Sequence, residues 1–131
     1  MAYKISAPIE HKVELIELDP SGDVYATFKE ATFAEHRKRQ EYFAENKIVY
    51  NDEQVTRITR LSDAEIAQLE VYLTLVECNI LDVDDKPLLA GGMTWDAFQI
   101  AVGKLRPFEF QALHAACMEA NPDWDFRSRG K

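Results

Sequence analysis

The sequence contains no apolar run that approaches the roughly 20 residues that a helix needs to cross a bilayer. It also lacks an apolar segment behind its first charged residue, as a secretory signal peptide would have. Cysteine is scarce, because Cys78 and Cys117 are the only two, and both fall in apolar segments where a free thiol acts as a small hydrophobic side chain. We therefore expect a cytoplasmic protein with reduced cysteines and no membrane partner.

Positive charge is also in short supply. The 131 residues include 15 Lys and Arg against 23 Asp and Glu, for a net charge of −8. Three of the positive charges lie in residues 127–131, which we interpret as a flexible basic tail. The remainder of the chain is more acidic still, and nucleic-acid binding depends on Lys and Arg that neutralise phosphates. We therefore expect no nucleic-acid partner.

Motifs for catalysis, phosphate binding and structural zinc are missing from the sequence. His114 and Cys117 share one helical face, which is half of a zinc site, but only Cys78 and His36 could complete it. The alternative is a partly buried histidine beside a core cysteine. We expect no catalytic residue, no metal and no cofactor, and hence no enzyme.

The stretch "CNILDVDDKPLL", residues 78–89, resembles the start of a calcium-binding loop. With Asp82 at the first position of an EF-hand loop, Lys86 falls at the fifth and Met93 at the twelfth, where the loop needs an oxygen ligand and a bidentate glutamate. Calcium binding is therefore not expected. We interpret the aspartates as a solvated polar turn that reverses the chain.

Residues 11–30, "HKVELIELDPSGDVYATFKE", predict a β-hairpin. Pro20 suits the first central position of a type I turn, and Gly22 suits the left-handed position that follows. Val24, Ala26 and Phe28 alternate with other residues at the period of a half-buried strand.

Helical signals begin after the hairpin. Thr32 and Glu35 form a capping box for a helix with a thin apolar face, and Arg39 is spaced for an ion pair with Glu35. The clearest helix covers residues 62–81, because its apolar residues recur at spacings of three and four. These residues are Ile66, Leu69, Leu73, Val76 and Ile80.

Two further helices are predicted near the C-terminus. Thr94 is a candidate N-cap, Pro107 begins the second helix, and the pair Asn121-Pro122 ends it. The order of elements predicts an α+β fold, an N-terminal β-hairpin followed by a mainly α-helical unit. We place residues 1–126 in a single domain, with a helical region over residues 32–121.

Several aromatic and apolar residues lie where core packing and a protein-binding surface are both open interpretations. Phe33, Tyr42 and Phe43 are predicted to share one face of the first, polar helix, Ile48 and Tyr50 follow that helix, and Trp124 follows the last helix. If they are exposed, they mark a site for a protein partner, because aromatic residues concentrate at such sites. The candidate partner-binding residues are Phe33, Tyr42, Phe43, Ile48, Tyr50 and Trp124.

Two long segments, residues 58–89 and 93–124, together resemble the tail assembly chaperones of long-tailed bacteriophages and prophages. The matching features are the capped helix from Ser62, the aspartate turn that runs to Pro87 and Leu88, the junction around Pro107 and the closing "NPDW". The resemblance covers most of residues 12–126.

The resemblance implies a small, cytoplasmic, non-enzymatic protein. Members of this family coat the long helical tape measure protein while tail tube subunits polymerise around it, and they are absent from the mature virion. A frameshifted longer product often recruits the tail tube protein, and members tend to self-associate, which implies a homo-oligomer. Two other classes stay open: a structural tail completion or head–tail connector protein, and a small regulatory protein-binding module.

Overall fold

The computed structural model describes residues 2–45 and 65–124, with the backbone alone for residues 43–45. Residues 65–74 form a helix in the described part of the chain. The other elements, in chain order, are β1 (Glu10–Glu14), β2 (Tyr25–Lys29), α1 (Phe33–Glu45), β3 (Leu75–Cys78), α3 (Trp95–Val102), α4 (Pro107–Ala120) and the 3-10 turn η1 (Pro122–Trp124). A three-stranded antiparallel sheet in the order β1-β2-β3 accompanies the helices, so the predicted α+β class is confirmed.

The β-hairpin forms as the sequence predicts. Strands β1 and β2 pair from Glu10 opposite Lys29 to Glu14 opposite Tyr25. The N–H of Gly22 donates to the carbonyl of Asp19 at 3.1 Å, which places Pro20 at the first central position of the turn. Gly22 has φ of +82°, a left-handed conformation that glycine adopts without steric cost.

The third strand corrects the prediction of one long helix over residues 62–81. Helical structure ends at Thr74, and residues Leu75–Cys78 pair with β2, with Ala26 opposite Cys78 and a β-bulge beside Thr27. The apolar spacing that suggested a helix is also compatible with a short buried strand. Pairing with β2 satisfies backbone groups along an edge that would otherwise be open, and this tertiary gain outweighs the local preference.

A tight turn follows β3, at the aspartates. One carboxylate oxygen of Asp82 accepts from the backbone N–H of Asp84 at 2.8 Å and of Lys86 at 3.0 Å. Asp85 has φ of +62°, which aspartate tolerates better than most residues. The predicted role in chain reversal is confirmed, and the chain runs back beside β3 to Gly91. A Cβ atom at Gly91 would lie 2.9 Å from two backbone carbonyls, so only glycine fits there.

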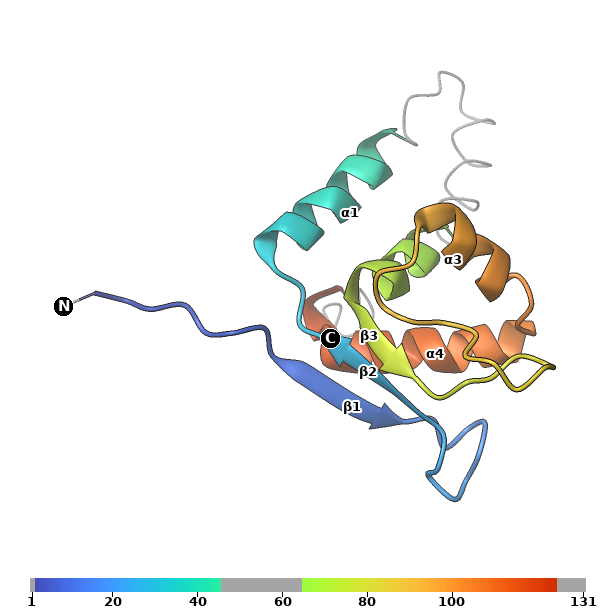
Figure 1. Ribbon diagram of the computed structural model, residues 1–131. Helices are drawn as coiled ribbons and strands as arrows, with labels where there is room; N and C mark the ends of the chain where they lie inside the picture. The colour runs from blue at the N-terminus through green and yellow to red at the C-terminus, as the bar shows by residue number, and fades with distance from the viewer. Residues whose placement is uncertain (1, 46–64, 125–131) are drawn as a thin grey trace, which may run out of the picture.

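The core lies between the sheet and the helices, with α4 running behind the strands (Figure 1). Phe28 of β2 and Leu113 and Cys117 of α4 are fully buried, and Phe98 of α3 is 1% exposed. The predicted starts of both C-terminal helices are confirmed. The hydroxyl of Thr94 accepts from a backbone N–H in the first turn of α3, and α4 begins at Pro107.

Asn121 ends α4 and joins it to the sheet. Its side-chain oxygen accepts from the N–H of Ala31 at 2.8 Å, and its side-chain nitrogen donates to the carbonyl of Lys29 at 3.1 Å. Asn121 is 7% exposed, so these bonds satisfy a buried amide. The C-terminus of α4 is thereby fixed to the chain that leads from β2 into α1.

None of the helices in the described residues is both long enough and apolar enough to span a membrane.

Candidate functional site

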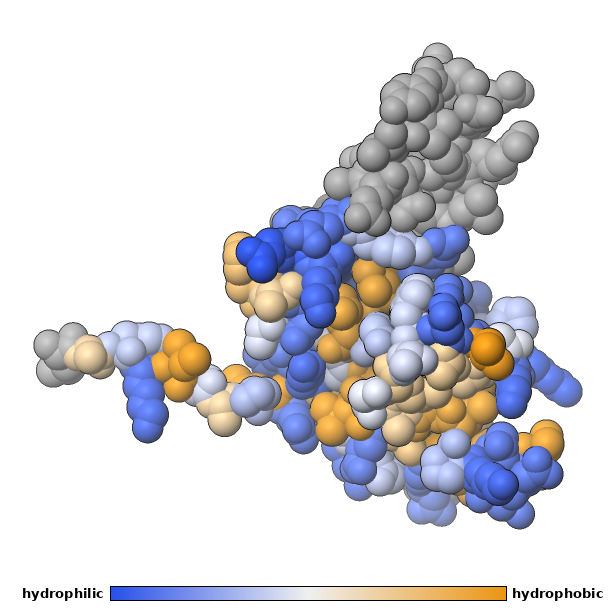
Figure 2. Space-filling model, turned by 45° about the horizontal axis from the view of Figure 1, so that its top comes forward, coloured by the Kyte–Doolittle hydropathy of each residue, from blue (hydrophilic) through white to orange (hydrophobic). Residues whose placement is uncertain are grey.

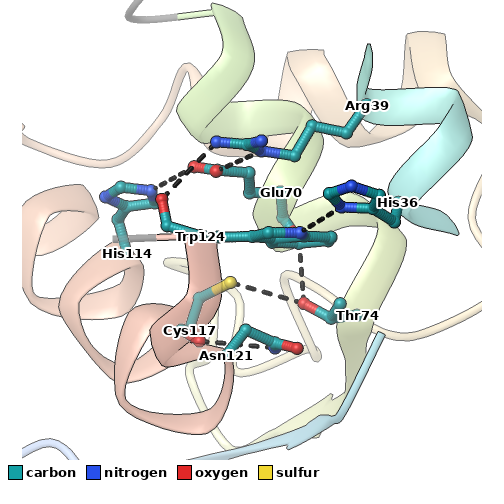
Figure 3. A network of polar contacts seen from close by, with 8 residues as sticks. All are labelled: His36, Arg39, Glu70, Thr74, His114, Cys117, Asn121 and Trp124. Atoms are coloured by element: carbon teal, nitrogen blue, oxygen red, sulfur yellow. Dashed lines mark hydrogen bonds and ion pairs between the residues drawn. The ribbon is translucent and has the colours of Figure 1, made fainter. Parts of the chain in front are cut away.

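A buried carboxylate connects α1 to two other helices, the helix of residues 65–74 and α4 (Figure 3). Glu70, on the helix of residues 65–74, is only 3% exposed. One of its oxygens accepts from Nε of Arg39 on α1 at 2.6 Å, and the other is 2.7 Å from Nε2 of His114 on α4. A buried charge is tolerated when it is paired and hydrogen-bonded in this way. We call Arg39, Glu70 and His114 the Glu70 network.

Trp124 closes the same region from η1. Its indole N–H donates to Nδ1 of His36 on α1 at 3.1 Å, and its ring lies 5.3 Å from the guanidinium of Arg39. That distance allows a cation–π interaction. Trp124 is 4% exposed, so of the two interpretations of this residue the structure shows core packing. Trp124 is therefore no longer a candidate for an exposed partner-binding surface.

The first helix is attached to the body by polar groups more than by an apolar face. The sequence predicts the thin apolar face of α1. The prediction of an ion pair between Glu35 and Arg39 is wrong. Glu35 instead contacts Lys29 at 3.1 Å and caps the helix through the N–H of Thr32 at 3.0 Å. Arg39 points inward to Glu70, because the attraction between opposite charges is stronger in the low dielectric of the interior than at the surface.

The capping carboxylate has a perturbed pKa. Partial burial raises the pKa of Glu35, but the hydrogen bonds from Thr32 and the charge of Lys29 outweigh burial, so the pKa lies below its usual value of 4.5. A lowered pKa in the folded state means that Glu35 stabilises the fold above about pH 4.5 and that this contribution is lost on acidification.

Cys117 is a core thiol. Burial raises the pKa of Cys117 to about 12, although a contact of 3.4 Å with the Thr74 hydroxyl opposes the shift. A thiol with such a pKa stays protonated at neutral pH and is a poor nucleophile and metal ligand. His114 contacts Glu70 rather than the thiol, and within the described residues no group of three or more His, Cys, Asp or Glu side chains could hold a metal.

Native Cys117 should resist alkylation. At pH 8 we expect iodoacetamide to modify Cys117 at least 100-fold more slowly in the native protein than in guanidinium, measured by peptide mass spectrometry. The free energy of unfolding should also fall as pH rises from 9 to 12, because the unfolded thiol loses its proton first. A Cys117→Ala variant should lack this part of the slope. Burial also raises the pKa of Cys78, so a Cys78→Ala variant should flatten the slope as well, but by less. Rapid native labelling would contradict the buried position.

The two candidate partner residues of α1 whose side chains the structure describes do not share one face. Phe33 is 75% exposed at the start of α1. Tyr42 is half-buried, its hydroxyl bonds to the carboxylate of Glu65, and its ring lies edge-on to Trp95 with centroids 6.3 Å apart. Nine helical residues make two and a half turns, so Phe33 and Tyr42 point to opposite sides. The prediction of a common Phe33 and Tyr42 face is therefore wrong.

The remaining candidates lie outside what the structure describes: the side chain of Phe43, and residues Ile48 and Tyr50 entirely.

Sequence reasoning missed the Glu70 network. Glu70 comes one helical turn after Ile66 and directly after Leu69, on the stripe that was expected to be buried. A charged residue on a buried stripe indicates a paired charge, since lone charges are almost never fully buried. That signal was available, but the identity of the partners was not, because Arg39 and His114 are 31 and 44 residues away.

The arrangement works as a clamp. Both oxygens of Glu70 are occupied, and no buried side-chain nitrogen or oxygen within residues 2–45 and 65–124 lacks a hydrogen-bond partner. A fully satisfied polar cluster holds helices in fixed positions. The network therefore holds α1 in a fixed orientation on the body.

No protein-family model matches the chain, and neither a curated protein nor a solved structure matches it.

Proposed function

We propose that the protein binds another protein through α1 and catalyses no reaction, and that it serves as a tail assembly chaperone for a phage tape measure protein. The observation that supports this most is the way α1 is held. Arg39 and His36 attach its inner side to Glu70 and Trp124, while Phe33, 75% exposed, points away from the body. A rigidly held helix with an exposed aromatic residue can dock against a second helix.

Charge suits the same role. The net charge of −8 keeps the protein soluble while it covers apolar segments of a long partner. The tape measure protein is the partner that the sequence resemblance implies, and a longer frameshifted product would add the tail tube protein. In this proposal the chaperone acts in the host cytoplasm and is released before the virion matures.

Replacing Phe33 with serine should weaken binding to the tape measure protein at least 10-fold. The side chain is exposed, so the melting temperature should change by less than about 2 °C, since exposed sites typically alter stability little. Binding is measured by calorimetry with the purified chain and a soluble tape measure fragment. Phe108→Ser is the matched control, because Phe108 is an exposed phenylalanine of α4, 54% accessible. Equal effects of the two variants would argue against α1 as the docking element.

The identity of the partner is tested separately. The tape measure protein of the same genome is expressed alone and together with this chain, and its soluble fraction is compared. We expect several-fold more soluble tape measure protein on co-expression and no trace of the chaperone in purified virions by mass spectrometry. A stoichiometric presence in virions would favour a tail completion or connector protein instead.

A further inference from the structure

The N-terminal arm, residues 2–9, runs away from the body without contacting it along most of its length (Figures 1 and 2). Tyr3 is 91% exposed and Ile5 is 81% exposed. Every second residue is apolar, from Tyr3 through Ile5 and Ala7 to Ile9, which is the period of a strand with one buried face. Large apolar side chains in this pattern suit a strand that gains a partner.

A groove of about 490 Å³ lies along the outer side of β1. Residues 12–17 form one wall, and α4 forms the other with Ala112, Ala115, Ala116 and Glu119. The alanines leave room for larger side chains, and Leu15 and Val13 on the strand side face the core. The groove therefore combines an apolar base with a charged rim of Lys12, Glu14, Glu17 and Glu119.

Backbone groups along the groove are open to a further strand. In the described sheet β1 is an edge strand. The N–H of Leu15 donates to Val24, and the carbonyl of Ile9 accepts from Glu30, so the odd-numbered residues of β1 face β2. In an antiparallel pair the intervening residues direct their backbone groups to the opposite side, here those of Lys12 and Glu14. These groups are a template for strand addition.

We infer that the arm of a second copy occupies this groove, as an antiparallel strand with Lys4 opposite Glu14. That register also places Tyr3 opposite Leu15 and Ile5 opposite Val13. Directly opposed residues share one face of a sheet, so both apolar arm side chains enter the groove towards α4. Lys4, the only charged residue between positions 2 and 9, meets a carboxylate.

The register is symmetric. Residue numbers of opposed pairs add to 18, so Ile9 meets its own copy at a two-fold axis, and each arm occupies the groove of the other copy. The result is a closed dimer in which the two sheets join. Pro8 lies opposite Glu10 in this register and has no N–H to donate, so that pair keeps only the bond from the N–H of Glu10. A shift by two residues in one direction would set Lys4 against Lys12, which repulsion disfavours.

The arm of the same chain cannot fill the groove. The bond from Glu30 to the carbonyl of Ile9, 2.7 Å long, holds the chain extended through residue 9. The tightest reversal that keeps this bond uses Ala7 and Pro8 as a two-residue turn, which sets Tyr3 opposite Lys12. No residue of the arm would then lie beside residues 14–17.

Sedimentation velocity tests the dimer with an arm variant and a groove variant. Wild-type protein at about 100 µM should sediment as a dimer. The arm variant, Tyr3→Ser with Ile5→Ser, should weaken association at least 10-fold, and the groove variant, Ala115→Arg, should do the same by filling the groove. Mixing the arm variant with the groove variant should restore a heterodimer through the one intact contact. Val83→Ser, at a 99% exposed apolar site in the aspartate turn, is the matched control and should leave the dimer unchanged.

Charge reversal tests the register. Lys4→Glu and Glu14→Lys should each weaken the dimer about 10-fold, since the two-fold axis gives two such cross-strand pairs and each contributes about 3-fold, and the double variant should recover it. A wild-type monomer at 100 µM, or an arm variant that still dimerises fully, would overturn the inference. It does not depend on the partner protein, because a chain that dimerises through its arms could still fail to bind a tape measure protein.

Discussion

An Arg39→Ala variant should lose about 3–5 kcal/mol of unfolding free energy, because it leaves the Glu70 carboxylate buried without its cationic partner. Glu70 is 3% exposed and Arg39 is 9% exposed, so neither charge can return to water without moving α1. For a domain of this size the loss corresponds to a melting temperature lower by roughly 10–15 °C. Chemical denaturation followed by circular dichroism measures the change.

A double variant separates the charge from the packing. Arg39→Met together with Glu70→Leu removes both buried charges and keeps most of the side-chain volume, so its stability should lie within about 2 kcal/mol of wild type. His114 then loses its partner, but its side chain is 28% exposed and can bind water. A double variant as unstable as Arg39→Ala would show that the stabilisation comes from packing rather than from the paired charge.

A Trp124→Ala variant should lose about 3–5 kcal/mol, the usual cost of removing a large aromatic side chain from a core. The residue is 4% exposed, and it contacts both His36 and Arg39 of α1. Its removal should therefore loosen α1 as well as lower the midpoint of urea unfolding. Hydrogen exchange of α1 amides measures the loosening.

Trp124→Phe is the control for the hydrogen bond. Phenylalanine keeps most of the apolar area but cannot donate to Nδ1 of His36, so a loss of about 1 kcal/mol from that bond is expected, in addition to a small packing cost. If Trp124→Ala left stability unchanged but weakened partner binding, Trp124 would belong to a surface, as one interpretation of the sequence held.

Local signals in the sequence were sufficient for much of the fold. The turn at Pro20 and Gly22, the cap at Thr32, the cap at Thr94 and the start of α4 at Pro107 each depend on residues within four positions of one another. Such features are read from backbone preferences and short-range hydrogen bonds, which tertiary structure rarely overturns. The α+β class followed from their order.

Contacts between distant residues could not be read in this way. β3 exists because β2 offers an open edge, and the residues of Leu75–Cys78 fit a helix equally well when taken alone. The inward position of Arg39 likewise depends on a glutamate 31 residues further along the chain. The spacing of four residues predicts Glu35 as the partner of Arg39. In the structure Arg39 pairs with Glu70 instead, because Glu70 is buried.

The candidate site was the least predictable part. Aromatic composition identified Trp124 and Phe33 together, although one is buried and the other is exposed. Composition records the type of a side chain and not the direction in which it points. Only the rotation of α1 on the body, fixed by His36 and Arg39, determines which aromatic residue of that helix meets solvent.

The bonds of Asn121 bear on when the protein can fold during synthesis. Its amide completes the hydrogen bonding of Ala31 and Lys29, which leave the ribosome about 90 residues earlier. Phe28 of the hairpin also needs Leu113 and Cys117 of α4 to exclude water from its ring. The hairpin therefore depends on α4, which comes about 90 residues later in the chain. We expect this domain to fold in one step after α4 has left the ribosome, because its contacts join residues that are distant in sequence.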